Sequence, residues 1–337
     1  MTIAEKLCQN LDLKKINKSK TGSLLIFNQN YIAEQFEDFF GIEKNINFEE
    51  AFNIVTTGQG NEMKKINSIH SSSLLSLLFF YPLYNNKNND IFIQFHDIFD
   101  LKDIKFTKCL FEVRNKVIRR PSCIDIVLIS EDEKVLLYLE SKLSEYMTVE
   151  SEQKYGKGYL KLYKKFNELN LLSPIKLDNE KEEKTILKCD EPSYIEGIKQ
   201  SISHLIGLVK GPTNENEKDP NADEYVLNEY NYYKNLYNQK DIKIFYNTII
   251  YNPEVLGLEN ETNKFESYLK LYQEIIGKNH NKILEIIRTI FKKYDKKKNI
   301  SIIDNPFTYN SMINQGFVSP SYNNILSNTK IKGFYKL

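Results

Sequence analysis

Two consecutive apolar segments, IDIVLIS (residues 124–130) and VLLYLE (residues 135–140), constrain the fold of this 337-residue chain more than any other feature. Both are rich in residues that favour β-strands, and only the charged tetrapeptide EDEK separates them. This pattern predicts a β-hairpin. Charged residues nevertheless lie at its open end: Asp125 in the first segment, and Glu140 and Lys142 at the end of the second. Because an unpaired charge is costly to bury, such residues indicate paired charges or a metal site.

The four-residue turn determines how the two segments would pair. With EDEK as the turn, Ile129 lies opposite Leu136, and Asp125 lies opposite Glu140. Directly opposed residues of an antiparallel pair have Cβ atoms about 4.5–5.5 Å apart, and two carboxylates at that distance repel each other unless a cation lies between them. Lys142 follows Glu140 by two positions, so both side chains leave the same face of a regular strand. We therefore expect two acids and one lysine to meet at one point of the sheet.

Two acids and a lysine in this arrangement suit metal-assisted hydrolysis of a phosphodiester. Mg²⁺ prefers carboxylate oxygens and binds through one or two carboxylates together with a substrate phosphate. The metal stabilises charge on the phosphate and lowers the pKa of a coordinated water. A lysine beside a ligand orients that water or neutralises the transition state. A surface hairpin whose acids simply face water is the competing interpretation.

The pattern of Asp125, a short turn and then Glu140-Ser141-Lys142 resembles the PD-(D/E)XK nuclease superfamily, which includes many restriction endonucleases. The resemblance covers roughly residues 91–253. It implies that Asp125 and Glu140 bind Mg²⁺, with Mn²⁺ as a substitute, and that Lys142 assists the attacking water. Ile124 stands where the superfamily pattern usually has a proline.

An acid one predicted strand earlier, Glu112, matches an upstream residue that often joins the metal ligands in this superfamily. An ion pair between Glu112 and Arg114 or Arg119 is the alternative. The basic run RNKVIRRPS (residues 114–122) precedes the first acid. It makes Arg114, Arg119 and Arg120 candidates for contacts with DNA phosphates, with a solvated basic loop as the other interpretation.

The segment SYIEGIKQSISHLIGLVKG (residues 193–211) has the apolar spacing of an amphipathic helix, which Gly211 and a following proline end. It carries Gln200 and His204, which lie one turn apart on one helix face. Some superfamily members carry a glutamine and a histidine at this spacing after the third strand. The resemblance therefore implies that Gln200 supports the catalytic site and that His204 contacts DNA. Gln153 competes with Gln200 because it is nearer to the lysine in the sequence, and a polar edge on a packed helix is the neutral alternative.

The segments around the hairpin indicate a helical frame. Residues 1–88 have mostly helical spacing, β-rich runs follow in KCLFEVRNKVI (residues 108–118) and DIKIFYNTIIYNP (residues 241–253), and helices resume after residue 255. The polar stretch VESEQKYGKGYLKLYKKFNELN (residues 149–170), inside an insertion at residues 146–194, is also expected to be helical.

This order predicts an α/β protein whose restriction-endonuclease-like core (residues 89–255) contains a mixed β-sheet flanked by helices. An N-terminal helical region (residues 1–88) and a C-terminal helical region (residues 256–337) would elaborate this core. No linker separates these regions, so one core with helical elaborations is expected.

Composition limits the partners and the compartment. A net charge of +1 excludes a polycation, so nucleic acid must be bound through a local patch. The four cysteines form no CxxC motif and indicate neither a zinc site nor a disulfide framework, which is typical of the reducing cytoplasm. The N-terminal residues lack the apolar core of a signal peptide, and the longest apolar run is too short to span a bilayer. We expect a cytoplasmic protein with no membrane partner.

Together these features predict a Mg²⁺-dependent DNA endonuclease of restriction or phage-defence type. Cleavage of both strands of a duplex generally needs two active sites, so a homodimer is an expected assembly. A non-catalytic nucleic-acid-binding or regulatory protein that keeps the nuclease fold is the alternative from another class. An RNA nuclease and an exonuclease stay open.

Overall fold

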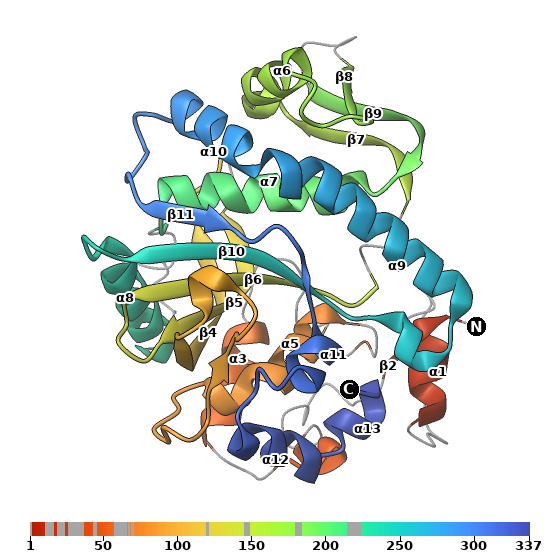
Figure 1. Cartoon of the computed structure of the whole chain (residues 1–337), viewed down its shortest axis with the longest axis vertical. Coiled ribbons are helices and arrows are strands. Elements are labelled where there is room, and N and C mark those ends of the chain that lie inside the picture. The colour runs from red at the N-terminus through yellow and green to blue at the C-terminus, as the bar shows by residue number, and fades with distance from the viewer. Residues whose placement is uncertain are drawn as a thin grey trace.

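A mixed β-sheet with the strand order β11-β10-β6-β5-β4-β3 lies at the centre of the structure, and β12 pairs with β10 as a further strand. This computed structural model describes residues 2–10, 17–18, 24–25, 37–42, 46–56, 66, 68, 71–118, 121–144, 149–178, 184–213 and 224–337. The strands of the central sheet are β3 (Ile93–Gln94), β4 (Lys105–Asn115), β5 (Ser122–Ser130), β6 (Val135–Lys142), β10 (Lys243–Ile250), β11 (Asn299–Ile302) and β12 (Phe307–Thr308). The α/β class expected from the sequence is confirmed (Figure 1).

The predicted hairpin forms β5 and β6. These strands are antiparallel, and Ile129 pairs with Leu136, as the four-residue turn predicts. Strand β10 runs parallel to its neighbours β6 and β11. Parallel neighbours need crossover connections, and helices supply them here.

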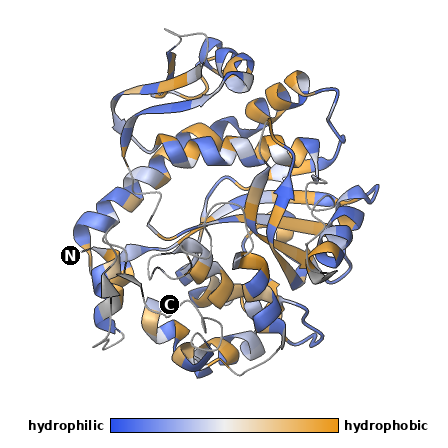
Figure 2. Ribbon diagram, turned by 180° about the vertical axis from the view of Figure 1, so that it is seen from behind, coloured by the Kyte–Doolittle hydropathy of each residue, from blue (hydrophilic) through white to orange (hydrophobic). Residues whose placement is uncertain are grey.

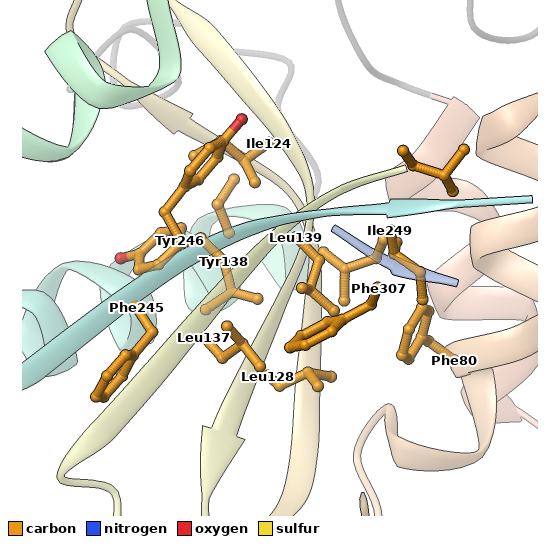
Figure 3. Close-up of a cluster of buried hydrophobic side chains, with 14 of the residues drawn as sticks. Phe80, Ile124, Leu128, Leu137, Tyr138, Leu139, Phe245, Tyr246, Ile249 and Phe307 are labelled. Carbon is orange, nitrogen blue, oxygen red and sulfur yellow. The ribbon is translucent and has the colours of Figure 1, made fainter. Parts of the chain in front are cut away.

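Strand β6 is buried along its whole length, because helices cover both faces of the sheet. Helix α7 (Ile195–Lys210) lies on one face, and α5 (Ser72–Phe80) and α11 (Tyr309–Asn314) lie on the other (Figure 1). Figure 3 shows Phe80 of α5 with Leu139, Ile249 and Phe307 on one side of the strands, and Tyr246 on the other side. A strand covered on both faces reads as a continuous apolar run, which explains the sequence VLLYL.

Helix α7 has the boundaries and the buried face that its apolar spacing predicts. Its isoleucine, leucine and valine side chains are buried, as are Gly197 and Gly207. The helix ends at Gly211, whose φ of +82° lies in a region that favours glycine.

The insertion is only partly helical, so the prediction for residues 149–170 was wrong for its first third. Residues Glu150–Gly156 form β7, which joins β8 (Lys176–Asp178) and β9 (Lys184–Ser193) in an antiparallel sheet with the order β7-β9-β8. Helix α6 (Leu160–Glu168) follows β7. The polar residues of β7 hid the alternation that is typical of a strand. Charged side chains of this sheet make ion pairs between its strands, including Lys188 with Glu152 and Asp178.

The N-terminal and C-terminal regions contain strands as well as helices. The described N-terminal residues include α1 (Ile3–Asn10), α3 (Ile46–Thr56) and a short strand pair, β1 (Asn17–Lys18) with β2 (Leu24–Leu25). The C-terminal region contains α9 (Glu259–Tyr272), a π-helical turn (Gln273–Gly277), α10 (Lys278–Ile290), α12 (Pro320–Asn328) and α13 (Ile331–Tyr335). It also supplies β11 and β12 to the central sheet, so this region is part of the core sheet.

Hydropathy follows this layered arrangement. Figure 2 shows hydrophobic residues concentrated in the central strands and on the helices next to them, while connections and outer helix faces are hydrophilic. Within the described part of the chain, no helix combines the length and the apolar character needed to cross a membrane.

Candidate active site

The three acids predicted as metal ligands lie on three neighbouring strands. In the ladder between β4 and β5, the residues that flank Glu112 pair with the residues that flank Asp125. The ladder between β5 and β6 ends with Ile126 paired to Leu139, one position before Asp125 and Glu140. The acids therefore lie where β5 and β6 separate at the open end of the hairpin.

Asp125 spans the gap where the ladder ends. Its Oδ2 atom accepts a hydrogen bond of 2.7 Å from the backbone N–H of Ser141. The carboxylate thus takes the place of a backbone acceptor at this point of β6. Glu140 and Lys142 are buried, and Asp125 is half-buried.

Glu140 and Lys142 form a buried ion pair on one face of β6. The Nζ atom of Lys142 donates to Oε1 of Glu140 at 2.7 Å. Each side chain is only 7% exposed. The predicted proximity of this acid and this lysine is therefore present in the structure.

The pKa values of the two hairpin acids are shifted in opposite directions. Burial, followed by repulsion from Glu140 and Glu112, raises the pKa of Asp125 well above its ordinary value. Burial also opposes ionisation of Glu140, but the neighbouring His204 and Lys142 outweigh it and lower the pKa of Glu140. The pair therefore combines one stable carboxylate with one that readily takes up a proton or a cation.

Glu112 has an unusual backbone for a strand residue. Its φ is +49°, a left-handed conformation that costs of order 1–3 kcal/mol in a residue other than glycine. Residues held in such sparsely populated conformations cluster at active sites and ligand-binding sites. This strain, together with the electrostatic effect of Glu112 on Asp125, favours a functional role over a simple surface ion pair.

His204 lies against the acids, on the side covered by α7. Its Nε2 atom is 2.9 Å from Oε2 of Glu140, and its Nδ1 atom is 2.5 Å from the hydroxyl oxygen of Ser122. The side chain is 6% exposed. Burial and two close polar neighbours keep the ring away from a solvent-facing DNA surface, so the predicted DNA contact of His204 does not fit its position.

The two glutamines expected near the lysine occupy different surroundings. Gln200 is half-buried on α7, one turn before His204. Gln153 lies on β7, where its side chain contacts Glu150 and accepts a hydrogen bond of 3.3 Å from Lys199. Gln153 is thus engaged with the insertion and the start of α7, and Gln200 stays the candidate on the helix that carries His204.

The basic residues predicted to contact DNA are placed only in part. Arg114 is half-buried on β4 and lines a small cavity together with Glu112 and Glu229. Arg119 and Arg120 lie outside the described residues. A phosphate contact by Arg114, Arg119 or Arg120 stays a prediction.

Ser122 is a site residue that the sequence did not identify. Its position beside His204 depends on how closely α7 approaches the sheet. A Cβ atom at Gly207 would lie 2.9 Å from Cβ of Asn115 and 3.6 Å from Cβ of Ser122. Gly207 on the buried face of the helix was the available signal for this close approach, but a glycine does not reveal which strand it faces.

The donor set fits a divalent cation that keeps part of its water shell. Asp125 and Glu140 offer two carboxylates, and Asp125 experiences repulsion that a cation would relieve. No group of three histidine, cysteine, aspartate or glutamate side chains within the described ranges is arranged to hold a metal alone. Mg²⁺ matches this limited set, because it usually binds through one or two carboxylates and completes its shell with water and substrate phosphate.

Comparison with known families supports the resemblance to restriction endonucleases. The model of a family described as "Restriction Endonuclease associating with ARP" matches residues 16–194, just over half of the chain. The matched segment includes Glu112, Asp125, Glu140 and Lys142 and ends directly before α7. No curated protein and no solved structure matches the chain.

Proposed function

The chain belongs to the restriction endonuclease family described as associating with ARP, and on that basis we propose that it is a Mg²⁺-dependent DNA endonuclease of restriction or phage-defence type. Family membership supports the nuclease-like role. The metal, the DNA substrate and the residues that act on it are the parts that we add. The same description makes ARP a proposed partner of this chain.

One observation carries the proposal: a buried Lys142–Glu140 pair lies beside Asp125, whose pKa is raised, at the end of a hairpin. A buried salt bridge is a weak source of stability, because desolvation offsets much of the attraction. A carboxylate with a raised pKa beside two other acids is likewise unfavourable in the ionised form. Both features are explained by a site where a cation and a substrate phosphate complete the charge balance.

Each residue has a defined task in this proposal. Asp125 and Glu140 hold the metal ion, and Glu112 contributes a third acid, directly or through water. When bound, the ion stabilises charge on the phosphate and lowers the pKa of the attacking water. Lys142 orients that water, since its ammonium group lies 2.7 Å from a ligand oxygen. Arg114, Arg119 and Arg120 contact DNA phosphates, and Gln200 supports the lysine side of the site.

A non-catalytic DNA-binding or regulatory protein is the second candidate, and one feature favours it. Both oxygens of Glu140 already face donors from the protein, Lys142 and His204. Because Lys142 and His204 balance the charge of Glu140, the group is also stable without a metal, as a purely structural element. The two candidates differ in whether the lysine is needed for cleavage.

Cleavage of end-labelled oligonucleotides separates these candidates. We would incubate the protein with duplex DNA, single-stranded DNA and RNA in MgCl₂, MnCl₂ or EDTA, and compare Lys142→Ala with Lys108→Ala. Lys108 is a matched control, because it forms an ion pair of the same 2.7 Å length with Glu133 but is 41% exposed.

The proposal predicts metal-dependent internal cleavage of DNA that Lys142→Ala abolishes and Lys108→Ala retains. Lengths of the labelled products distinguish internal cuts from removal of terminal nucleotides. Binding without cleavage by all folded variants, in every metal, would support the non-catalytic candidate. Preferential cleavage of RNA would correct the substrate.

A further inference from the structure

A line of four buried side chains connects strand β5, helix α7 and strand β6. The hydroxyl of Ser122 lies 2.5 Å from Nδ1 of His204, Nε2 of His204 lies 2.9 Å from Oε2 of Glu140, and Oε1 of Glu140 accepts from Lys142 at 2.7 Å. All four residues are at most 7% exposed. Each carboxylate oxygen of Glu140 thus faces its own nitrogen.

In a neutral histidine ring, one nitrogen donates a hydrogen bond and the other accepts one. In the tautomer that carries its hydrogen on Nε2, the ring makes a polar contact of 2.9 Å with Glu140, and Nδ1 is free to accept the hydroxyl hydrogen of Ser122. Ser122 therefore fixes the orientation of the imidazole, and the imidazole fixes one oxygen of the glutamate.

This arrangement resembles the support that ligands of metal sites receive in other proteins. Carboxylates that bind a metal are themselves hydrogen-bonded, and loss of such a partner typically weakens metal binding or activity 10–100-fold. A glutamate has several rotatable bonds, so Oε1 and Oε2 need fixed neighbours to present one geometry. The hydrogen bond from Lys142 fixes Oε1, and the contact with His204 adds a neighbour for Oε2.

We propose that His204 is a positioning residue that holds Glu140 in its metal-binding orientation, and that Ser122 anchors His204. The inference rests on the proposed function, because it assigns Glu140 as a metal ligand. It also extends the site beyond the segment that the family model matches, since α7 begins after residue 194. Helix α7 is then part of the catalytic centre and more than a cover for the sheet.

Magnesium binding tests this role without relying on cleavage. We would measure the rise in Tm with increasing MgCl₂ from an EDTA-treated start, which reports an apparent Kd by mass action. The variants are His204→Leu, His204→Gln and Ser122→Ala, all in the full-length chain. His280→Gln is the matched control, because His280 is half-buried on α10, pairs with Asp304 and is not one of the four side chains of this line.

The Mg²⁺ dependence distinguishes positioning from simple packing. We expect His204→Leu to raise the apparent Kd for Mg²⁺ 10–100-fold. His204→Gln recovers most of this loss, since its amide donates to Glu140 and accepts from Ser122. Ser122→Ala raises the apparent Kd for Mg²⁺ less than His204→Leu does. Combining the two substitutions adds little, because both remove the same chain of contacts from Ser122 through His204 to Glu140. Should His204→Leu fail to fold, Ser122→Ala and His204→Gln carry the comparison.

Three results would overturn the inference. A folded His204→Leu variant with the wild-type Kd for Mg²⁺ contradicts it, and so does a glutamine variant that performs no better than leucine. A wild-type protein whose Tm does not respond to Mg²⁺ or Mn²⁺ contradicts the proposed function as well. The first two results leave that function standing.

Discussion

The carboxylate of Asp125 on β5 accepts a hydrogen bond of 2.7 Å from the backbone N–H of Ser141 on β6. A side chain of β5 therefore pairs with the backbone near the end of β6. This bond holds Asp125 beside Glu140 even though burial and repulsion raise its pKa. The hairpin therefore keeps two acids together at an energetic cost when no cation is present.

Replacement of Asp125 should expose this cost. Asp125→Asn keeps an oxygen that can accept from Ser141 and removes one negative charge, so we expect the metal-free protein to gain roughly 1 kcal/mol at pH 8. The pKa of Asp125 is raised in the folded state, which means that the wild-type stability falls as pH rises from the ordinary aspartate range through the folded pKa. The advantage of the variant should therefore shrink at acidic pH. Urea denaturation in EDTA at several pH values measures it, and a variant that is much less stable at pH 8 would contradict the expectation.

Loss of Lys142 should be far more damaging than loss of Lys108. Lys142→Ala leaves Glu140 buried with only His204 as a neighbouring donor, so we expect a loss of about 2–4 kcal/mol. Lys108→Ala breaks an exposed pair and should cost at most about 1 kcal/mol. Chemical denaturation of both variants in EDTA provides the comparison. Equal losses would mean that the Lys142–Glu140 pair is not a buried pair in solution.

The backbone of Glu112 gives a prediction with an unusual sign. Glu112→Gly should be more stable than Glu112→Gln by about 1 kcal/mol, although glycine is unfavourable in ordinary strands. Both substitutions remove the carboxylate, so the difference reports the φ of +49°. The free energies of unfolding of the two variants decide the point. A glutamine variant that is clearly the more stable one would contradict the left-handed conformation.

Glu229 predicts a pH effect outside the site. This residue of α8 (Glu224–Asn238) accepts a hydrogen bond of 2.9 Å from the hydroxyl of Tyr84, and burial raises its pKa to about 8. The folded state holds the proton more tightly than the unfolded chain, so this residue makes wild-type stability decline between about pH 4.5 and pH 8. Glu229→Gln should flatten this part of the profile and be more stable than the wild type at pH 9 by at least about 1 kcal/mol. Parallel profiles for both proteins would show that Glu229 is not buried in its acid form.

Local patterns predicted the centre of the fold well. The two apolar runs and the EDEK turn determine strand pairing over a short distance, and the observed pairing of Ile129 with Leu136 confirms the expected register. The spacing of α7 and its terminal Gly211 likewise depend on neighbouring residues alone.

Non-local contacts explain what the sequence did not reveal. Strand β7 is polar, and only its pairing with β9 makes it a strand. Strands β11 and β12 are short, and their place in the sheet depends on β10. The contact between Ser122 and His204 depends on the docking of α7, which no local period encodes.

Cleavage of supercoiled plasmid by the wild-type protein and by Asp125→Ala, with MgCl₂ and with EDTA, tests the central claim most directly. The predicted result is nicking or linearisation that requires Mg²⁺ and disappears in the variant, while circular dichroism shows both proteins folded. Discrete fragments would add sequence specificity to this result. Uncut plasmid from folded wild-type protein in Mg²⁺ and Mn²⁺, or equal cleavage by Asp125→Ala, would contradict the assignment of this site.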